Sequence, residues 1–168
     1  MARKKLDFPN GVVDCIEATR SRGTILCAGD SKASNGMTIG WISIGHAWGR
    51  EGCAVLVRPS RHTFTFMESG DSFTVNVLSE KLQEAVDLFG DKSGRDMDKF
   101  AAAKLTRVKG EKVSAPYIKE ADLVIECKIA LKQPMNPSLI SADFVRECYE
   151  SGDYHTIYYG EIVAIHAK

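Results

Sequence analysis

The chain has 168 residues, of which 44% are hydrophobic and 26% are charged, and its 22 basic and 22 acidic side chains cancel. A chain of this length can bury a core of its own, so we expect residues 1–168 to form a single domain. The balanced charge argues against a nucleic-acid-binding protein, because such proteins usually carry a basic excess.

Apolar runs rich in β-branched and aromatic residues recur along the chain, with turn residues between them. Seven short runs of this kind favour an antiparallel barrel or sandwich over the strand–helix alternation of a parallel sheet. We therefore expect a mainly β fold. The predicted strands cover residues 12–18, 24–28, 37–44, 53–57, 72–78, 123–131 and 157–165.

Helices are predicted to be few and short. Residues 63–69 form a helix that Gly70 closes. Ser79 caps a second helix over 80–89, where apolar residues recur at i, i+3, i+4 and i+7. A third helix opens at Pro137 or Ser138 and carries one apolar face through residue 148.

Five cysteines occur without a CxxC pair or regular spacing, which favours buried, reduced thiols over metal or redox chemistry. The four histidines lack ligand spacing, so no metal site is predicted. The basic start, MARKKLDFPNG, is not followed by the apolar region of a secretory signal, and no 18-residue apolar stretch is present. These features predict a cytoplasmic protein that does not associate with a membrane.

Four stretches are unusual for purely structural segments. The first, SNGMTIGWISIG at 34–45, carries polar and aromatic groups along a strand that a buried position would not need. The second, RPSRHTFTF at 58–66, gathers arginines and hydroxyls at a helix start. That arrangement suits a phosphate. The alternative is a solvated turn in which Thr63 caps the helix.

The third stretch, GDKSGRDMDKF at 90–100, is either a charged surface loop with weak ion pairs or a lid over an anionic ligand. Neither GxGxxG nor GxxxxGK[ST] occurs in the chain, so no standard nucleotide loop is predicted. The fourth, GDYHTIYYGEIVAI at 152–165, places His155 at a strand entry. This histidine is either structural or, if it faces a cleft, oriented by Asp153 and Tyr158. No nucleophile elbow is found.

Six motifs in order resemble those of the flavin reductase-like family, the FMN-binding split barrels that include flavoredoxins. They are N-G-M-T-x-G-W at 35–41, R-P-x-R-x-T at 58–63, G-D-S-F-T-V-N-V-L at 70–78, S-G-R-D-x-D-K-F at 93–100, V-x-x-P-x-I-x-E-A at 113–121 and H-T-I-x-x-G-E-I-V at 155–163. The resemblance implies a Greek-key split barrel that forms a homodimer, with FMN in a groove near the subunit interface.

The resemblance also implies roles for single residues. The isoalloxazine and ribityl side would be lined by Asn35, Met37, Thr38, Trp41 and Ser43. The ribityl and phosphate contacts would come from Arg58, Pro59, Ser60, Arg61 and Thr63, and the far ring edge would lie along Asn76, Val77, Leu78 and Ser79. The phosphate would be reached from the lid by Ser93, Arg95 and Lys99.

The implied activity is an FMN-dependent reductase that passes hydride from NAD(P)H through the flavin to free flavin, a ferric complex or a partner protein. His155 would lie near the nicotinamide or the acceptor. The alternatives are an electron carrier between proteins and a split-barrel binding module without flavin. Two departures stand out: the loop 46–52 lacks the proline-rich sequence of many relatives, and Tyr154 is inserted between Asp153 and His155, which leaves the role of Asp153 open.

Overall fold

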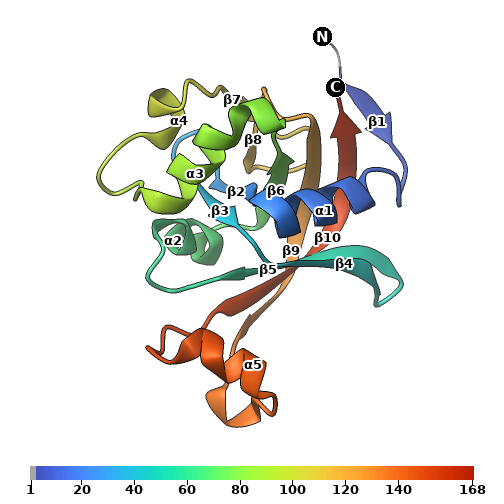
Figure 1. Cartoon of the computed structure of the whole chain (residues 1–168). Coiled ribbons are helices and arrows are strands. Elements are labelled where there is room, and N and C mark those ends of the chain that lie inside the picture. The colour runs from blue at the N-terminus through green and yellow to red at the C-terminus, as the bar shows by residue number, and fades with distance from the viewer. Residues whose placement is uncertain (1–2) are drawn as a thin grey trace.

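The computed structural model describes residues 3–168. Its main feature is one antiparallel sheet in the order β3-β2-β6-β9-β10-β5-β4, with β1 paired to the end of β10 (Figure 1). The strands of this sheet are β1 (Lys4–Leu6), β2 (Thr24–Gly29), β3 (Ser34–Ile39), β4 (Ile42–Ala47), β5 (Arg50–Val57), β6 (Ser72–Val77), β9 (Leu123–Pro134) and β10 (Thr156–Ala167). A separate two-stranded sheet pairs β7 (Arg107–Lys109) with β8 (Pro116–Ile118). The predicted mainly β fold is confirmed.

The two edge strands of the sheet, β3 and β4, are neighbours in the sequence. Only Gly40 and Trp41 separate them. Ile39 and Ile42 are three positions apart, so their Cα atoms can be at most about 11 Å from each other, and the sheet must curl until its edges approach at this point. The result is a barrel that is held together at one corner and open along the remaining length of β3 and β4. This corner positions the candidate functional site.

Five α-helices and three 3-10 turns complete the fold among the described residues. The helices are α1 (Val12–Arg22), α2 (His62–Ser69), α3 (Gln83–Asp91), α4 (Lys99–Ala102) and α5 (Asp143–Arg146), and the 3-10 turns are η1 (Glu80–Leu82), η2 (Pro137–Leu139) and η3 (Glu147–Tyr149). Figure 1 shows α5 on an excursion between β9 and β10 that extends away from the sheet. No helix within residues 3–168 is long and apolar enough to cross a membrane.

The strand predicted over residues 12–18 is wrong, because this segment is the helix α1. Its buried residues are Val12, Cys15, Ala18 and Thr19, which recur every three to four positions as one face of a helix does. Gly11, with a φ of 80°, turns the chain into the helix in a conformation that suits glycine. The run of β-branched residues hid this helical period.

The strand predicted over 37–44 is also wrong as a single element, since Gly40 and Trp41 divide it into β3 and β4. The helix predicted over 80–89 begins as η1 and becomes α-helical at Gln83, with Gly90 inside it. The helix predicted after Pro137 is broken into η2, α5 and η3, and Phe144 on its expected apolar face is 74% exposed.

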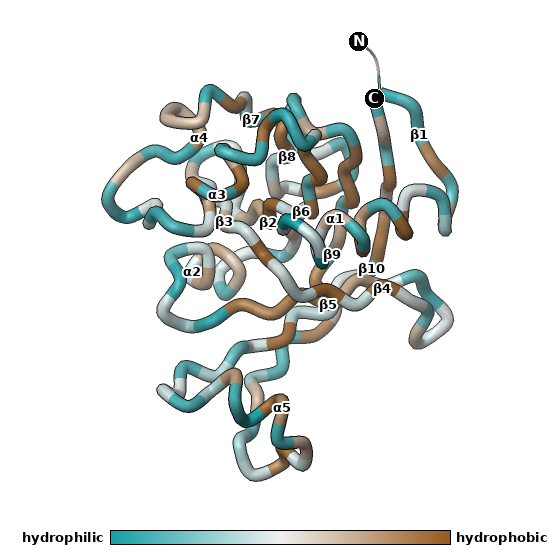
Figure 2. Tube along the Cα trace, viewed as in Figure 1, coloured by the Kyte–Doolittle hydropathy of each residue, from teal (hydrophilic) through white to brown (hydrophobic). Residues whose placement is uncertain are grey.

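Two clusters of buried residues form the core. The larger lies inside the curled sheet and includes Phe73, Ile125 and Tyr158. The smaller packs α3 and the 100–121 segment against β2 and includes Phe89 and Phe100, whose rings meet edge to face at 4.9 Å. Figure 2 shows hydrophobic residues concentrated along β5 and β10 and hydrophilic ones along the loop before α4.

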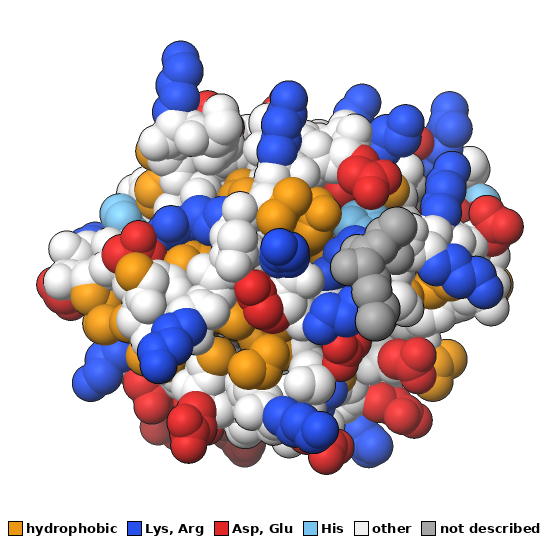
Figure 3. Space-filling view, turned by 90° about the horizontal axis from the view of Figure 1, so that it is seen from above, with side chains coloured by type: hydrophobic (Ala, Val, Ile, Leu, Met, Phe, Trp, Pro, Cys, Tyr) orange, Lys and Arg blue, Asp and Glu red, His pale blue; other side chains and the backbone are white. Residues whose placement is uncertain are grey.

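All five cysteines are free, and four of them are buried. Burial raises the pKa of the Cys15 and Cys27 thiols to about 12, which makes these groups unreactive at neutral pH. Cys148, on the excursion, is the exposed exception to the predicted burial. On the face seen in Figure 3, acidic and basic side chains are interspersed around hydrophobic ones, so this face has no continuous basic surface.

Candidate functional site

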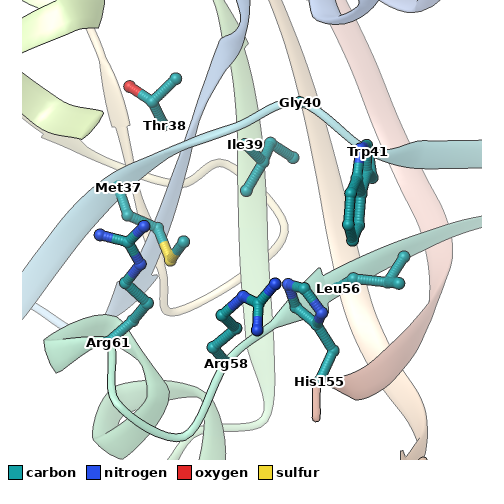
Figure 4. A pocket seen from close by; sticks show the side chains of 9 residues that line it. All are labelled: Met37, Thr38, Ile39, Gly40, Trp41, Leu56, Arg58, Arg61 and His155. Atoms are coloured by element: carbon teal, nitrogen blue, oxygen red, sulfur yellow. The ribbon is translucent and has the colours of Figure 1, made fainter. Parts of the chain in front are cut away.

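A pocket of about 200 Å³ lies at the corner where β3 passes into β4. We call it the corner pocket; it is lined by Met37, Thr38, Ile39, Gly40, Trp41, Leu56, Arg58, Arg61 and His155. Figure 4 shows the ring of Trp41 close to that of His155, with Arg58 beside the histidine and Arg61 beside Met37. Apolar and aromatic side chains therefore share this pocket with two arginines.

A second pocket, of about 160 Å³, lies at the start of α2. We call it the cationic pocket; it is lined by Asn35, Met37, Ser60, Arg61, His62, Thr63, Phe89, Asp91, Lys92, Ser93, Gly94, Arg95 and Lys99. Four basic side chains and one acidic side chain line it. The first amides of a helix and its dipole add positive potential at such a place, so the pocket suits an anion.

The two pockets adjoin each other, because Met37 and Arg61 line both of them, and we call the pair the groove. Each alone is smaller than the roughly 300–1,000 Å³ typical of a pocket that holds a drug-sized ligand. Together they offer an elongated site with a basic end and an aromatic end. That polarity suits a ligand with an anionic tail and a flat ring system.

Arg58 holds the segment that precedes β10 against the turn after β5. Its guanidinium group donates hydrogen bonds to three backbone carbonyl oxygens, those of Cys148 (2.9 Å), Gly152 (3.3 Å) and Asp153 (2.9 Å). It also lies 5.0 Å from the ring centre of Tyr149. Arg58 therefore fixes the approach to His155, and much of its donor capacity is already used.

Asp153 has a definite role in this arrangement. Its carboxylate accepts hydrogen bonds from the amide of Ser60 at 3.2 Å and from the hydroxyl of Ser60 at 2.6 Å. Arg95 donates to the carbonyl oxygen of Ser60 at 3.0 Å, and Arg61 donates to that of Gly90 at 3.4 Å. The 58–61 turn is thus tied both to the segment before β10 and to the loop after α3.

Lys99 is the most enclosed cation of the groove, with 3% of its surface exposed. Its ammonium group donates to the carbonyl oxygens of Phe89 at 2.9 Å and Lys92 at 3.1 Å. Burial lowers the pKa of Lys99 to about 8. An anion in the cationic pocket would offset that loss of solvation and favour the charged form.

His155 is 8% exposed and forms part of the corner pocket. Its ring centre lies 5.1 Å from that of Trp41, with an angle of 53° between the planes. Burial, aided by the charge of Arg58, lowers the pKa of His155 to about 4. The imidazole is therefore neutral at physiological pH.

Most of the predicted site residues lie along this groove. The corner pocket includes Met37, Thr38, Trp41, Arg58, Arg61 and His155, and the cationic pocket adds Asn35, Ser60, Thr63, Ser93, Arg95 and Lys99. Thr63 does not cap α2: its hydroxyl accepts a hydrogen bond from the Asn35 side-chain amide at 2.9 Å. The Thr38 hydroxyl donates a hydrogen bond to the carbonyl oxygen of Val86.

The structure places residues 76–79, predicted to lie along the far ring edge, away from the two pockets of the groove. Asn76 is fully buried, donates to the carbonyl oxygen of Ile25 and accepts from the amide of Ile118 at 2.8 Å. Val77 and Leu78 belong to the core, and Ser79 precedes η1. None of the four lines either pocket of the groove; Asn76 and Val77 belong to β6, which lies between β2 and β9 inside the sheet.

Two other predicted residues also lie off the groove. Ser43, on β4, lines a neighbouring pocket of about 510 Å³ beside α1. Pro59 lines neither the corner pocket nor the cationic pocket. Its cyclic side chain instead restricts the backbone of the turn that carries Ser60 and Arg61.

Several groove residues were not predicted from the sequence. His62 follows the R-P-x-R motif, and its buried Nδ1 has no hydrogen-bond partner within residues 3–168. Gly94 passes so close to Asn35 that a Cβ would lie 2.1 Å from the Oδ1 atom. Lys92, in the loop after α3, adds a further cation. The available signal was that His62 and Gly94 lie inside the quoted motifs and Lys92 inside the 90–100 stretch.

Within residues 3–168, no three His, Cys, Asp or Glu side chains are arranged so that they could hold a metal ion. The residues that line the groove also do not form the hydrogen-bonded nucleophile and general base of a hydrolase. What it offers is a shaped surface with cationic and aromatic ends. A site of this kind suits a bound organic cofactor that carries the reactive chemistry itself.

Comparisons with known proteins give one family. A model described as the flavin reductase like domain matches residues 18–168. A protein of Archaeoglobus fulgidus without a described function is 28% identical over 154 residues, which span 92% of this chain and 77% of that protein.

Solved structures agree with that match. The flavoredoxin of Desulfovibrio vulgaris (Miyazaki F) superposes with a TM-score of 0.69 at 26% identity, covering 87% of this chain and 69% of that one. The flavoredoxin of Methanosarcina acetivorans gives a TM-score of 0.68 at 25% identity, covering 88% and 68%.

Proposed function

The chain belongs to the flavin reductase-like family, and on that premise we propose that it binds FMN along the groove and reduces it with NAD(P)H. The observation that carries the proposal is that the cationic and corner pockets adjoin each other at Met37 and Arg61. FMN has the matching shape, with a phosphate at one end and a planar ring system at the other.

The residues present fit this cofactor. The basic end offers Arg61, Lys92, Arg95 and Lys99 to a phosphate dianion, and charge-assisted hydrogen bonds to such donors are the strong ones. The buried Nδ1 of His62 is a further polar atom there without a partner among the described residues. At the other end, Trp41 and Leu56 offer an aromatic and an aliphatic surface to a ring.

When bound, FMN supplies the ability to accept a hydride and pass electrons on, which the side chains cannot do themselves. The chain binds the phosphate, orients the ring at the corner and leaves one side accessible to the nucleotide and the acceptor. Trp41 is 44% exposed, which is consistent with an open side. The acceptor is free flavin, a ferric complex or a partner protein.

We further propose that the working form is a homodimer. The groove is open to solvent, and a second copy of the chain would enclose it. Specific homodimers commonly bury about 2,000 Å² or more, so the assembly should persist on dilution. Light scattering at low micromolar concentration should give twice the mass of one chain; a monomer that still holds FMN would contradict this proposal.

A second function is favoured by the likeness to two flavoredoxins at 26% and 25% identity. In that case the chain carries electrons between proteins and oxidises NAD(P)H poorly. Both functions need the same groove, and they differ in what reduces the cofactor. The identity of the electron donor therefore distinguishes the two functions.

The deciding experiment mixes the FMN-loaded protein anaerobically with NADH or NADPH and follows the visible flavin absorption by stopped flow. Bleaching within seconds by either nucleotide is the expected result. Bleaching only by a reduced protein donor would make the chain a carrier. A colourless protein after incubation with FMN and desalting would rule out a tightly held cofactor.

A further inference from the structure

Tyr149, on the excursion between β9 and β10, contacts the candidate catalytic histidine directly. Its hydroxyl oxygen lies 2.7 Å from Nδ1 of His155, and both residues are buried, at 4% and 8% exposure. The same hydroxyl lies 3.2 Å from the sulfur of Met135. The amide of Met135 in turn donates to the carbonyl oxygen of His155 at 3.0 Å, so the three residues form one packed unit.

The single proton of the Tyr149 hydroxyl has two acceptors within reach, an imidazole nitrogen and a thioether sulfur. The imidazole nitrogen is much the stronger acceptor. Burial raises the pKa of the Tyr149 phenol, and the guanidinium group of Arg58, 5.0 Å from the ring centre, only partly opposes this, so the hydroxyl keeps its proton and can donate it. Donation to Nδ1 leaves that atom without a proton, and the neutral ring then carries its proton on Nε2.

We propose that Tyr149 is a positioning residue that fixes His155 as a neutral donor, with its Nε2–H available to the corner pocket. Nε2 makes no hydrogen bond to any described residue, and His155 lines that pocket beside Trp41. A neutral imidazole N–H can polarise a carbonyl oxygen without giving up its proton. The ligand class that suits it is a planar molecule with a carbonyl or carboxamide oxygen, stacked near Trp41.

This inference rests on the proposed function for its substrate, since a nicotinamide carboxamide and a quinone-type acceptor both present such an oxygen. The charged groups around the imidazole are Arg58, Arg61 and Asp153. Burial and the two arginines disfavour the imidazolium, while Asp153 opposes them less strongly. The Nε2–H group of the neutral His155 should therefore remain a hydrogen-bond donor, unchanged, through neutral pH and down to about pH 5, since the pKa of His155 is about 4.

The first test reads the tautomer itself. In protein with ¹⁵N-labelled histidine, NMR of both the FMN-free and the FMN-loaded form should show an unprotonated Nδ1 and a protonated Nε2 for His155, constant from pH 8 to 5.5. Tyr149→Phe keeps the ring but removes the hydroxyl, and it should give mixed tautomers. Tyr154→Phe is the control, because Tyr154 stacks on Tyr149 at 4.8 Å without bonding His155. A proton on Nδ1 in the unchanged protein would overturn the proposal.

The second test measures the effect of Tyr149 on the reaction with the nucleotide. Tyr149→Phe should lower kcat/KM for the nucleotide about tenfold, the scale of one hydrogen bond, while FMN affinity stays the same. An unchanged kcat/KM together with a disturbed tautomer would overturn the assigned substrate contact. If neither nucleotide reduces the loaded protein, the reductase proposal fails, and the NMR result then decides the role of Tyr149 by itself.

Discussion

The guanidinium group of Arg58 lies 2.9 Å from the carbonyl oxygen of Asp153 and holds the segment that precedes β10 in place. Arg61, three residues further on, makes only a long hydrogen bond of 3.4 Å to the carbonyl oxygen of Gly90 within the described residues. The two arginines of the R-P-x-R-x-T motif therefore have different roles. Arg58 orders the protein, and Arg61 remains available to a ligand in both pockets.

Arg61→Ala should weaken FMN binding by about 1.5–3 kcal/mol, the scale of a hydrogen bond to a charged group. Riboflavin binding should change little, because riboflavin lacks the phosphate. Fluorescence titration with both flavins measures the difference. Arg146→Ala is the control, since Arg146 pairs with Asp143 on the excursion and lines neither pocket of the groove. Equal losses for the two flavins would contradict a phosphate role.

Arg58→Ala should behave differently from Arg61→Ala. Loss of its three hydrogen bonds frees the segment 148–153, so thermal stability should fall and FMN and riboflavin should weaken together. Calorimetry and the same titration measure both effects. A selective loss of FMN would instead show that Arg58 contacts the phosphate.

The pKa of Lys99, lowered by burial to about 8, predicts a pH dependence of FMN binding. Below pH 8 the free protein holds a charged lysine, whereas above it the lysine is neutral and must take up a proton when the dianion binds. The Kd for FMN relative to riboflavin should therefore rise with pH above about 8, by up to tenfold per pH unit.

Lys99→Arg is the matched variant for this test, since arginine stays charged throughout the accessible range. Its FMN to riboflavin affinity ratio should be nearly flat from pH 7 to 9.5. The same slope in both proteins would show that another group causes the dependence.

The sequence identified the groove better than it identified the elements that carry it. Asn35, Arg61, Arg95 and Lys99 lie around one pocket, as the ordered motifs indicated. Residues 76–79 do not, because their alternation is that of a central strand with both faces covered, and only the three-dimensional pairing of β6 with β2 and β9 reveals this.

The hydrogen bond between Tyr149 and His155 could not be predicted from the sequence, for a different reason. The two residues are six positions apart, on a segment whose predicted single helix is broken into η2, α5 and η3. A continuous helix would have directed Tyr149 elsewhere. The three carbonyl contacts of Arg58 help to hold the broken form, and such contacts cannot be read from periodicity.

Glu126 should be important for stability away from the groove. It is fully buried and accepts hydrogen bonds from the amides of Glu111 and Lys112, at 2.9 and 2.7 Å, and from Nε2 of His166 at 3.0 Å. Glu126→Gln replaces one acceptor oxygen by a donor that faces other donors. It should lower the free energy of unfolding by about 3 kcal/mol.

Urea unfolding measures this loss, and Glu120→Gln is the control. Glu120 also accepts from a backbone amide, that of Thr106 at 2.9 Å, but it is only partly buried and this hydrogen bond is exposed to solvent. Water can replace that bond, so the change should stay under about 1 kcal/mol. Similar losses of unfolding free energy in the two variants would show that burial of the Glu126 carboxylate does not increase its contribution to stability.

Trp41 gives the most direct test of ligand contact at the corner, because it lines the pocket and is 44% exposed. Trp48, the other tryptophan, is 72% exposed on the β4–β5 hairpin and packs against Tyr159. In a Trp48→Phe background, bound FMN should strongly quench the emission of Trp41, and removal of FMN should restore it. Equal emission with and without FMN would place the ring system elsewhere.

In the same background, Trp41→Leu distinguishes a ligand contact from a packing contact. A fully buried tryptophan replaced by a small side chain costs about 3–5 kcal/mol of stability, whereas a half-exposed one at a pocket wall loses little packing. The FMN-free protein should therefore unfold within about 1 kcal/mol of its parent, while FMN affinity falls. If the variant unfolds far more easily and binds FMN as before, the corner at Gly40 and Trp41 serves the fold and not the ligand.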